Sequence, residues 1–198
     1  FEHFHPKLPE SAKDAPFLFL GNIHPSLQLE VLEQAHPRFT GLDTMNLWIN
    51  IALDDLKQVL TRVDVLIIND SEVALLTGES NLVKGAREIK ILGPRIVVVK
   101  KGEHGCLLFS ETGIFSAPAY PLEEVVDPTG AGDTFAGGFI GHLAKSDKPD
   151  DAALRRAVVY GSVAASFTCE KFGPDRLSEI TRADIDKRFA EFQRLANF

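Results

Sequence analysis

The 198-residue sequence has few cysteines and no long apolar run, and each scarcity excludes a class of protein. Its two cysteines, Cys106 and Cys169, are far apart and form no Cys-x-x-Cys pair, which argues against a zinc site and a disulfide framework and is typical of a reducing compartment. No apolar run approaches membrane-spanning length, and residues 1–10 carry His, Pro and charge where a signal peptide would be apolar. We therefore expect a cytoplasmic protein.

Blocks of basic residues are also absent. With 21 Lys and Arg against 28 Asp and Glu, the formal net charge is -7, which argues against binding to nucleic acid or to an anionic membrane. The six histidines show no metal-ligand spacing. The patterns GxxxxGK[ST] and an early GxGxxG are missing, so neither a P-loop NTPase nor a dinucleotide-dependent dehydrogenase is supported. A content of 44% hydrophobic residues predicts one globular domain over residues 1–198.

Apolar runs bounded by turn residues alternate with helical patterns along the chain. Continuous Val/Ile runs are typical of parallel strands that are covered on both faces, so the alternation predicts an open, doubly wound α/β sheet. Ligands of such sheets bind beyond the carboxyl ends of the strands. The expected strands are 17–20, 39–43, 65–68 and 96–99, with a hairpin over 106–109 and 114–118; the expected helices are 26–35 (capped by Ser26), 53–60, one starting at Asn69 or Ser71, 152–167 and 181–195.

The most informative stretch is residues 127–139, DPTGAGDTFAGGF, where a loop turns into a helix near Gly132 or Asp133. The first amides of a helix have no intrahelical partner and lie at its positive end, so Gly130, Ala131 and Gly132 can present N–H groups to a phosphate. Asp133 could instead be a simple N-cap. A cap needs no glycines around it, which favours the anion site.

This stretch resembles the C-terminal signature of the ribokinase-like (phosphofructokinase B-type) carbohydrate kinases. The resemblance implies a three-layer α/β/α sandwich with a mostly parallel central sheet. It implies transfer of phosphate from ATP, with Mg²⁺, to a hydroxyl of a sugar or nucleoside. Gly130, Ala131 and Gly132 would form the anion hole, and Asp133 would contact the substrate as the general base. The chain begins at Phe1 without an initiator Met and resembles only the later part of a full member, so we expect a fragment that lacks the N-terminal portion and the lid.

Asn69-Asp70-Ser71-Glu72 directly follows an expected strand. Such a polar cluster can hold a hydrated Mg²⁺ through a carboxylate and waters, or it can be a helix capping box, and the spacing alone does not separate the two. The resemblance implies the first role, in which Asn69 and Glu72 organise Mg²⁺ and phosphate through water.

Several further residues are candidates for binding the nucleotide. The loop after the strand 96–99 resembles the one that passes beside ATP in the family, which implies contacts from Lys100, Gly102 and Gly105, although the family often has Thr or Ser where Lys100 stands. A lysine can bind phosphate there as a point charge. Thr129 lies within the signature. Ser162 and Ala165 correspond to the adenine pocket, whereas the small residues around them are also typical of close helix packing.

Two further residues each have two alternative roles that the sequence does not distinguish. Asn46 is a candidate for contact with the nucleotide or the substrate, or for capping the next helix. Asp127 is a candidate for supporting the loop by hydrogen bonds, or for holding a monovalent cation such as K⁺, as in some relatives. The motifs do not distinguish a sugar kinase from a nucleoside kinase, and a kinase-like binding protein without turnover is the alternative from another class. The family's dimers are usually built through the lid, so a homodimer is an expectation for the full-length protein alone.

Overall fold

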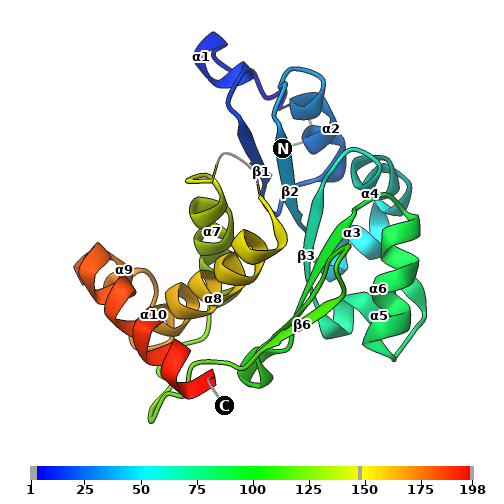
Figure 1. Ribbon diagram of the computed structural model, residues 1–198. Coiled ribbons are helices and arrows are strands. Elements are labelled where there is room, and N and C mark those ends of the chain that lie inside the picture. Colours follow the sequence, from blue (N-terminus) through cyan, green and yellow to red (C-terminus); the bar gives the residue numbers. More distant parts are fainter. Residues whose placement is uncertain (1–3, 147–148, 197–198) are drawn as a thin grey trace. The chain divides into compact units, whose positions relative to one another are not determined.

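The computed structural model describes residues 4–146 and 149–196 (Figure 1). The chain divides into two compact units: unit 1 comprises Phe1–Val99 and Phe109–Glu111, and unit 2 comprises Lys100–Leu108 and Thr112–Phe198. The strands form a six-stranded sheet in the order β1-β2-β3-β4-β5-β6. The α/β class with a mostly parallel sheet is thereby confirmed. The prediction of a single domain stays a prediction.

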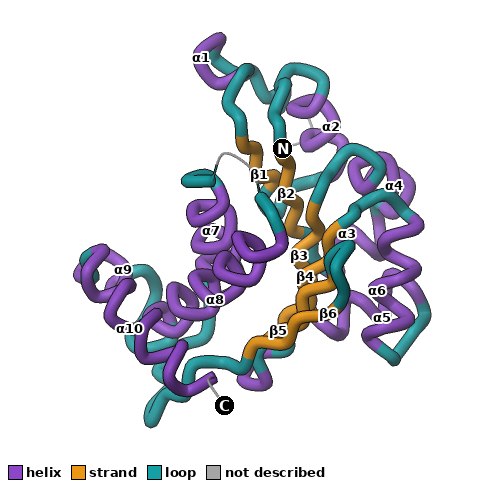
Figure 2. Tube along the Cα trace, in the orientation of Figure 1, coloured by secondary structure: helices purple, strands orange, loops and turns teal. Residues whose placement is uncertain are grey.

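Unit 1 contains the parallel strands, which are orange in Figure 2. They are β1 (Phe17–Leu20), β2 (Phe39–Asp43), β3 (Val65–Asn69) and β4 (Ile96–Lys100), whose last residue belongs to unit 2. Strand β2 pairs in parallel with β1 and β3, so that Leu42 lies opposite both Leu20 and Leu66. The apolar residues of β3 and β4 are buried almost completely, as expected for central parallel strands. The strands are therefore those that the sequence predicts, to within one residue at each end.

Helices pack around these strands within unit 1. They are α1 (Glu10–Lys13), α2 (Pro25–Leu32), α3 (Asn46–Ile51), α4 (Leu53–Leu60), α5 (Asp70–Thr77) and α6 (Leu82–Ile91). Helix α2 packs on α4, and α5 packs on α6 and α3. The prediction that Ser26 caps α2 is wrong: His24 is the N-cap, and its Nδ1 accepts a hydrogen bond from the Ser26 amide at 3.2 Å. Pro25 then takes the first helical position, where its missing N–H costs nothing.

Unit 2 includes the signature stretch, residues 127–139. Its elements are the 3-10 turn Gly102–His104, β5 (Cys106–Phe109, whose last residue belongs to unit 1), β6 (Ile114–Ala117), α7 (Ala131–Leu143), α8 (Asp151–Thr168), α9 (Asp175–Glu179) and α10 (Arg182–Ala196). Helices α7 and α8 lie side by side, and α10 packs on α8 (Figure 1). A Cβ built on Gly138 would lie 3.0 Å from Tyr160 O on α8, so this glycine permits the close approach of the two helices. By contrast, a Cβ on Gly137 would meet nothing within 4 Å.

The guanidinium of Arg188 ties α10 to α8. Its Cζ lies 3.5 Å from the centroid of the Phe167 ring, and Nη1 donates to Ser166 Oγ at 2.9 Å. Nη2 forms an ion pair with Glu170 Oε1 at 2.5 Å. A stacked guanidinium that donates to two different partners holds the two helices together in a way that a lysine ammonium would not.

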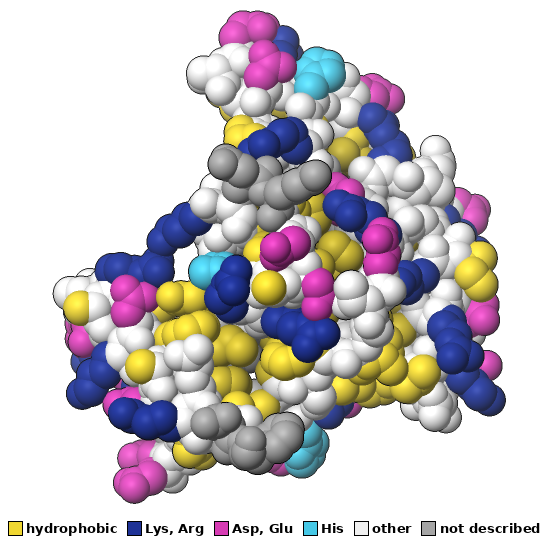
Figure 3. Space-filling model, in the orientation of Figure 1, with side chains coloured by type: hydrophobic (Ala, Val, Ile, Leu, Met, Phe, Trp, Pro, Cys, Tyr) yellow, Lys and Arg dark blue, Asp and Glu magenta, His cyan; other side chains and the backbone are white. Residues whose placement is uncertain are grey.

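On the face seen in Figure 3, acidic and basic side chains are interspersed, and no basic patch spans it. Among the described residues, no helix combines the length and apolar character needed to cross a bilayer.

Candidate active site

The candidate site begins at the first turn of α7. Gly130 is the N-cap, with φ 80° and ψ -1°, a left-handed conformation that a residue with a side chain rarely adopts. The Ala131 amide donates to Pro128 O at 3.1 Å, and the Thr134 amide donates to Gly130 O at 2.9 Å. Between them, the amides of Gly132 and Asp133 have no acceptor in the described part of the chain. Two N–H groups at the positive end of a 13-residue helix are therefore available to an anion.

Asp133 is the third residue of α7, so it is not the N-cap, and the simple capping role is wrong. The helix begins one to two residues earlier than the sequence predicts, because Gly130 can take the left-handed turn that starts it. Asp133 is exposed, and its carboxylate makes no hydrogen bond or ion pair with the described residues. Asp133 is thus placed to accept a proton from a bound molecule.

Asp127 supports the loop before α7. Its Oδ1 accepts a hydrogen bond from the Thr129 amide at 2.9 Å. This bond, with further ones from the Thr129 hydroxyl and the Gly173 backbone, holds the pKa of the Asp127 carboxyl below its usual value. Beside it, the Val126 amide donates to Cys169 O at 2.9 Å. The loop that starts α7 is therefore attached to Cys169 at the end of α8, a link that no sequence motif indicated.

Lys100 extends from the end of β4 to this same helix start. A Cβ built on Gly132 would lie 3.1 Å from Lys100 Nζ, which is closer than nearly all real Cβ contacts. The ammonium therefore lies against the first turn of α7. The sequence predicted a phosphate contact by Lys100 but did not reveal its proximity to Gly132, because 31 residues lie between the two along the chain.

Glycine stands at two positions of the loop after β4 for different structural reasons. Gly102 has φ 55° and starts the 3-10 turn, with open space where a Cβ would be. Gly105 has φ 79°, and a Cβ there would collide with the backbone of Ala117 and Pro118. The close approach of that segment explains Gly105 without a nucleotide. The Lys101 amide donates to Gly105 O at 2.8 Å and closes the loop.

Asn69 and Glu72, in unit 1, form a complete capping box at the start of α5. Asn69 Oδ1 accepts from the Glu72 amide at 2.8 Å, and Glu72 Oε2 accepts from the Asn69 amide at 3.0 Å. Asn69 Oδ1 also accepts from Ser71 Oγ at 2.7 Å. Glu72 is only 8% exposed, and no described hydrogen bond engages its other oxygen, Oε1. That oxygen suits an outer contact with hydrated Mg²⁺, whereas Asn69 Oδ1 is already occupied by two donors.

The remaining predicted residues are less distinctive. Ser162 lies on α8, and burial raises the pKa of the Cys106 thiol to about 11 although Ser162 acts to lower it. Ala165 is half-buried on α8. Asn46 is exposed at the first position of α3, and Met45 is the N-cap, so the capping role of Asn46 is wrong. Within the described residues there is no group of three or more His, Cys, Asp or Glu side chains that could hold a metal ion by itself.

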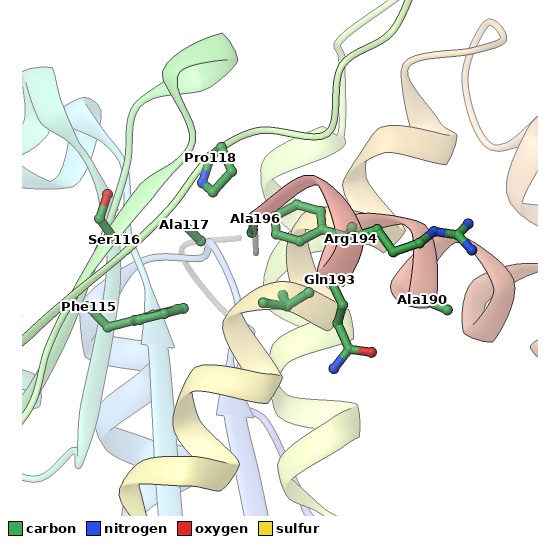
Figure 4. Close-up of a pocket in the computed structure, with 10 residues that line it drawn as sticks. Phe115, Ser116, Ala117, Pro118, Ala190, Gln193, Arg194 and Ala196 are labelled. Carbon is green, nitrogen blue, oxygen red and sulfur yellow. The ribbon is translucent and has the colours of Figure 1, made fainter. Parts of the chain in front are cut away.

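A pocket of about 620 Å³ lies within unit 2, between β6 and α10 (Figure 4). None of the predicted site residues lines it; the wall is made by Phe115, Ser116, Ala117, Pro118, Val159, Ala190, Phe192, Gln193, Arg194 and Ala196. The pocket is therefore separate from the residues that carry the phosphate-binding features.

The sequence pattern of the pfkB family carbohydrate kinases matches residues 17–181, which include both the signature and the loop after β4. The chain belongs to this family. It is 33% identical over 154 residues to the cytidine kinase of Thermococcus kodakarensis, covering 75% of the chain and 54% of that kinase. It is 30% identical over 125 residues to fructokinase-2 of Zea mays, covering 62% of the chain and 37% of the relative. This chain thus spans about half, or less, of the length of these curated relatives.

Solved structures show the same fold. Ribokinase from Thermotoga maritima superposes with a TM-score of 0.74 at 25% identity, covering 91% of this chain and 58% of that one. A putative ribokinase II from E. coli in complex with ATP and Mg²⁺ gives a TM-score of 0.71 at 24% identity, covering 89% of this chain and 58% of that one. The ribokinase-like fold of the chain is therefore confirmed.

Proposed function

We propose that the full-length protein carrying this chain is an ATP-dependent kinase that phosphorylates a hydroxyl of a sugar or nucleoside. The observation that supports this most strongly is the start of α7, where the amides of Gly132 and Asp133 find no acceptor, and the Asp133 carboxylate no partner, among residues 4–146 and 149–196. Membership of a kinase family supports the same chemistry. Phosphoryl transfer needs a positioned base and fixed positive dipoles, and this turn has both.

In the proposed reaction Asp133 accepts the proton of the substrate hydroxyl. The hydroxyl oxygen then bonds to the γ-phosphorus of ATP, and the bond between that phosphorus and the β,γ-bridging oxygen breaks, which releases ADP. The predicted anion hole of Gly130, Ala131 and Gly132 is proposed to surround the transferred group with the amides of Gly132 and Asp133 as its donors, since the Ala131 amide already donates to Pro128 O. The left-handed Gly130 starts the helix so that the following amides face outward from its end.

Each remaining predicted residue has a proposed role of its own. When bound, Mg²⁺ would neutralise charge on the phosphates, and Glu72, with Asn69 behind it, would hold its waters. Gly102, Gly105, Thr129, Ser162 and Ala165 would border the nucleotide together with Lys100, and Asn46 would contact the substrate. Asp127 is proposed to support the loop, with K⁺ ligation as its alternative role. A cytoplasmic location, and a homodimer of the full-length protein, remain predictions.

The test is ATP consumption by the full-length protein with Mg²⁺ and separate pools of sugars and nucleosides. We expect Asp133→Asn to lower kcat by about 10²-fold or more, since a general base contributes about that much. Asp54→Asn is the matched control, because Asp54 is also an exposed carboxylate in the first turn of a helix, α4, and should leave kcat unchanged.

The pools also separate the two substrate classes. The similarity to a cytidine kinase specifically favours a nucleoside, so turnover with the nucleoside pool alone would identify that class. Equal activity of wild type and Asp133→Asn would show that Asp133 is not the base. Absence of turnover with every pool would favour a binding protein without catalysis.

A further inference from the structure

A hydrogen bond between two threonine hydroxyls joins the first turn of α7 to the end of α8. Thr168 Oγ1 donates to Thr134 Oγ1 at 2.9 Å, and Thr134 directly follows Asp133. Thr168 is only 3% exposed, so its hydroxyl depends on a partner within the protein. The Thr134 amide also donates to Gly130 O at 2.9 Å. Thr134 therefore connects the turn that carries Asp133 both to the N-cap of α7 and to α8.

A second hydrogen bond joins the same end of α8 to the loop that precedes α7. The last carbonyls of a helix receive no intrahelical hydrogen bond. Cys169 is the C-cap of α8, and its carbonyl oxygen accepts from the Val126 amide at 2.9 Å. Val126 and Thr134 lie on either side of residues 127–133. Two consecutive residues at the end of α8, Thr168 and Cys169, thus hold both flanks of the stretch that ends at the proposed base.

The packing farther along the two helices is of a different kind. A Cβ built on Gly161 of α8 would lie 2.8 Å from Phe135 O on α7, so the helices approach each other closely there. Apolar burial is not directional and does not fix the rotation of one helix against another. A hydrogen bond requires a narrow range of distances and angles. The Thr134–Thr168 bond therefore specifies the orientation of the first turn of α7, which close packing alone leaves free.

We infer that Thr168 is a positioning residue for phosphoryl transfer, which acts through Thr134 to fix the direction in which Asp133 meets the substrate. The inference rests on the proposed function. Asp133 is exposed, so the direction of its carboxylate depends on the backbone of α7. A base must lie within hydrogen-bond reach of the proton that it accepts, and a misplacement of about 1 Å can cost about 10²-fold in rate. Thr168 itself touches neither the substrate nor the phosphate, and the proton still passes from the substrate hydroxyl to Asp133.

The experiment measures kcat and KM of the full-length protein with Thr168→Val, Thr168→Ser and Thr134→Val. Valine has nearly the shape of threonine but no hydroxyl, whereas serine keeps the hydroxyl. We expect each valine variant to lower kcat by about 10-fold to 10²-fold with little change in KM. Thr168→Ser should recover most of the activity. The double valine variant should lose no more than either single variant, because both changes remove the same bond.

Thr77 provides the matched control. Thr77 is the last residue of α5, as Thr168 is the last residue of α8, and its Oγ1 donates to Val73 O at 2.7 Å. Thr77→Val therefore removes one hydroxyl hydrogen bond from a helix end in unit 1. Both Thr77→Val and Thr168→Val should lower the thermal midpoint by about 2–4 °C, the shift expected for one lost hydrogen bond. Only Thr168→Val should lower kcat, which separates positioning from stability.

Two further measurements report on the start of α7 itself. Hydrogen exchange of the peptide 127–139 should be faster in Thr168→Val than in wild type or Thr77→Val. In the Asp133→Asn background, Thr168→Val should lower kcat by a smaller factor than in wild type, because the base that it positions is already absent. A general loss of stability would lower kcat by the same factor in both backgrounds.

The outcomes distinguish this inference from the proposed function. If wild type turns over and Thr168→Val keeps its kcat, the bond serves the fold alone, so the inference is overturned and the proposed function stands. An equal loss of kcat in the Asp133→Asn background, or no recovery by Thr168→Ser, would also overturn the inference. If wild type consumes no ATP with any pool, the proposed function fails and the positioning role of Thr168 fails with it.

Discussion

Two glycines in the α7–α8 pair illustrate that the effect of substituting a helical glycine depends on its surroundings. A Cβ on Gly161 of α8 would lie 2.8 Å from Phe135 O and 3.1 Å from Phe135 Cδ2 on α7. A Cβ on Gly141 of α7 would meet nothing within 4 Å. Both residues lie inside helices, so helix propensity alone would predict the same effect of substitution at both.

The residue-scale prediction is that alanine has opposite effects at these two positions. Gly161→Ala should lower the free energy of unfolding by about 1–3 kcal/mol, because a methyl group must displace the α7 backbone. Gly141→Ala should raise it by about 0.5–1 kcal/mol, because the unfolded chain loses freedom and the helix gains propensity. Urea denaturation monitored by circular dichroism measures both. Equal effects at the two positions would contradict the close packing of α7 on α8.

At the scale of the element, α5 and α6 begin with the same kind of cap. Asn69 Oδ1 accepts from the Glu72 amide, and Asn81 Oδ1 accepts from the Val83 and Lys84 amides at 3.0 and 3.1 Å. Only Asn69 belongs to the stretch that the family resemblance links to Mg²⁺. A comparison of Asn69 with Asn81 therefore separates the structural role of a helix cap from a functional role in binding Mg²⁺.

The element-scale prediction is that Asn69→Ala and Asn81→Ala each lower the free energy of unfolding by about 1 kcal/mol, the usual cost of losing an N-cap. Only Asn69→Ala should also raise the Mg²⁺ concentration needed for half-maximal activity in the full-length protein. Asn69→Ser, which restores a capping oxygen, should recover the stability but not the Mg²⁺ response. If the two alanine variants respond to Mg²⁺ identically, Asn69 serves the helix cap alone.

At the scale of the whole molecule, unit 2 contains a set of exposed or half-buried carboxylates that are stabilised in their ionised form. Hydrogen bonds to each lower its pKa: the largest cause is the Thr129 amide for Asp127, the Lys171 ammonium for Glu179, the Thr181 hydroxyl for Asp184 and the Arg182 guanidinium for Asp186. Since the pKa is lower in the folded state, each bond stabilises the fold above the unfolded pKa of about 4. This contribution is lost as the pH falls through the folded pKa.

We therefore expect acid to loosen the α9–α10 region of unit 2 below about pH 4. Hydrogen exchange along a pH series should show increased exchange of α10 amides in that range. Asp184→Asn is the test variant, because the Thr181 amide donates to Asp184 Oδ2 at 2.8 Å at the start of α10. Its thermal midpoint should lie below that of wild type at neutral pH and equal it once the carboxyl is protonated. A difference that persists in acid would show that the charge of Asp184 is irrelevant.

The predictable part of the fold follows from local patterns. Continuous runs such as Val65–Ile68 identify buried strands because few other structures hide four consecutive apolar side chains. Helix α3 was missed because its six residues, NLWINI, show no helical stripe and its N-cap, Met45, makes no side-chain hydrogen bond. Helix α6 was missed although Asn81 caps it, since Gly85 interrupts its interior and is explained only by contact with Val73 on α5.

The candidate site likewise has features that the sequence shows locally and contacts that it does not show. A glycine-rich loop, an acid three residues into a helix and a polar cluster after a strand are contiguous in the chain, so the sequence sufficed to locate them and to indicate the family. The proximity of Lys100 to Gly132 and the hydrogen bond from the Val126 amide to Cys169 O join segments that are distant along the chain. Such contacts depend on how the segments of unit 2 pack, and packing is set by the shapes of many side chains together, which no local spacing records.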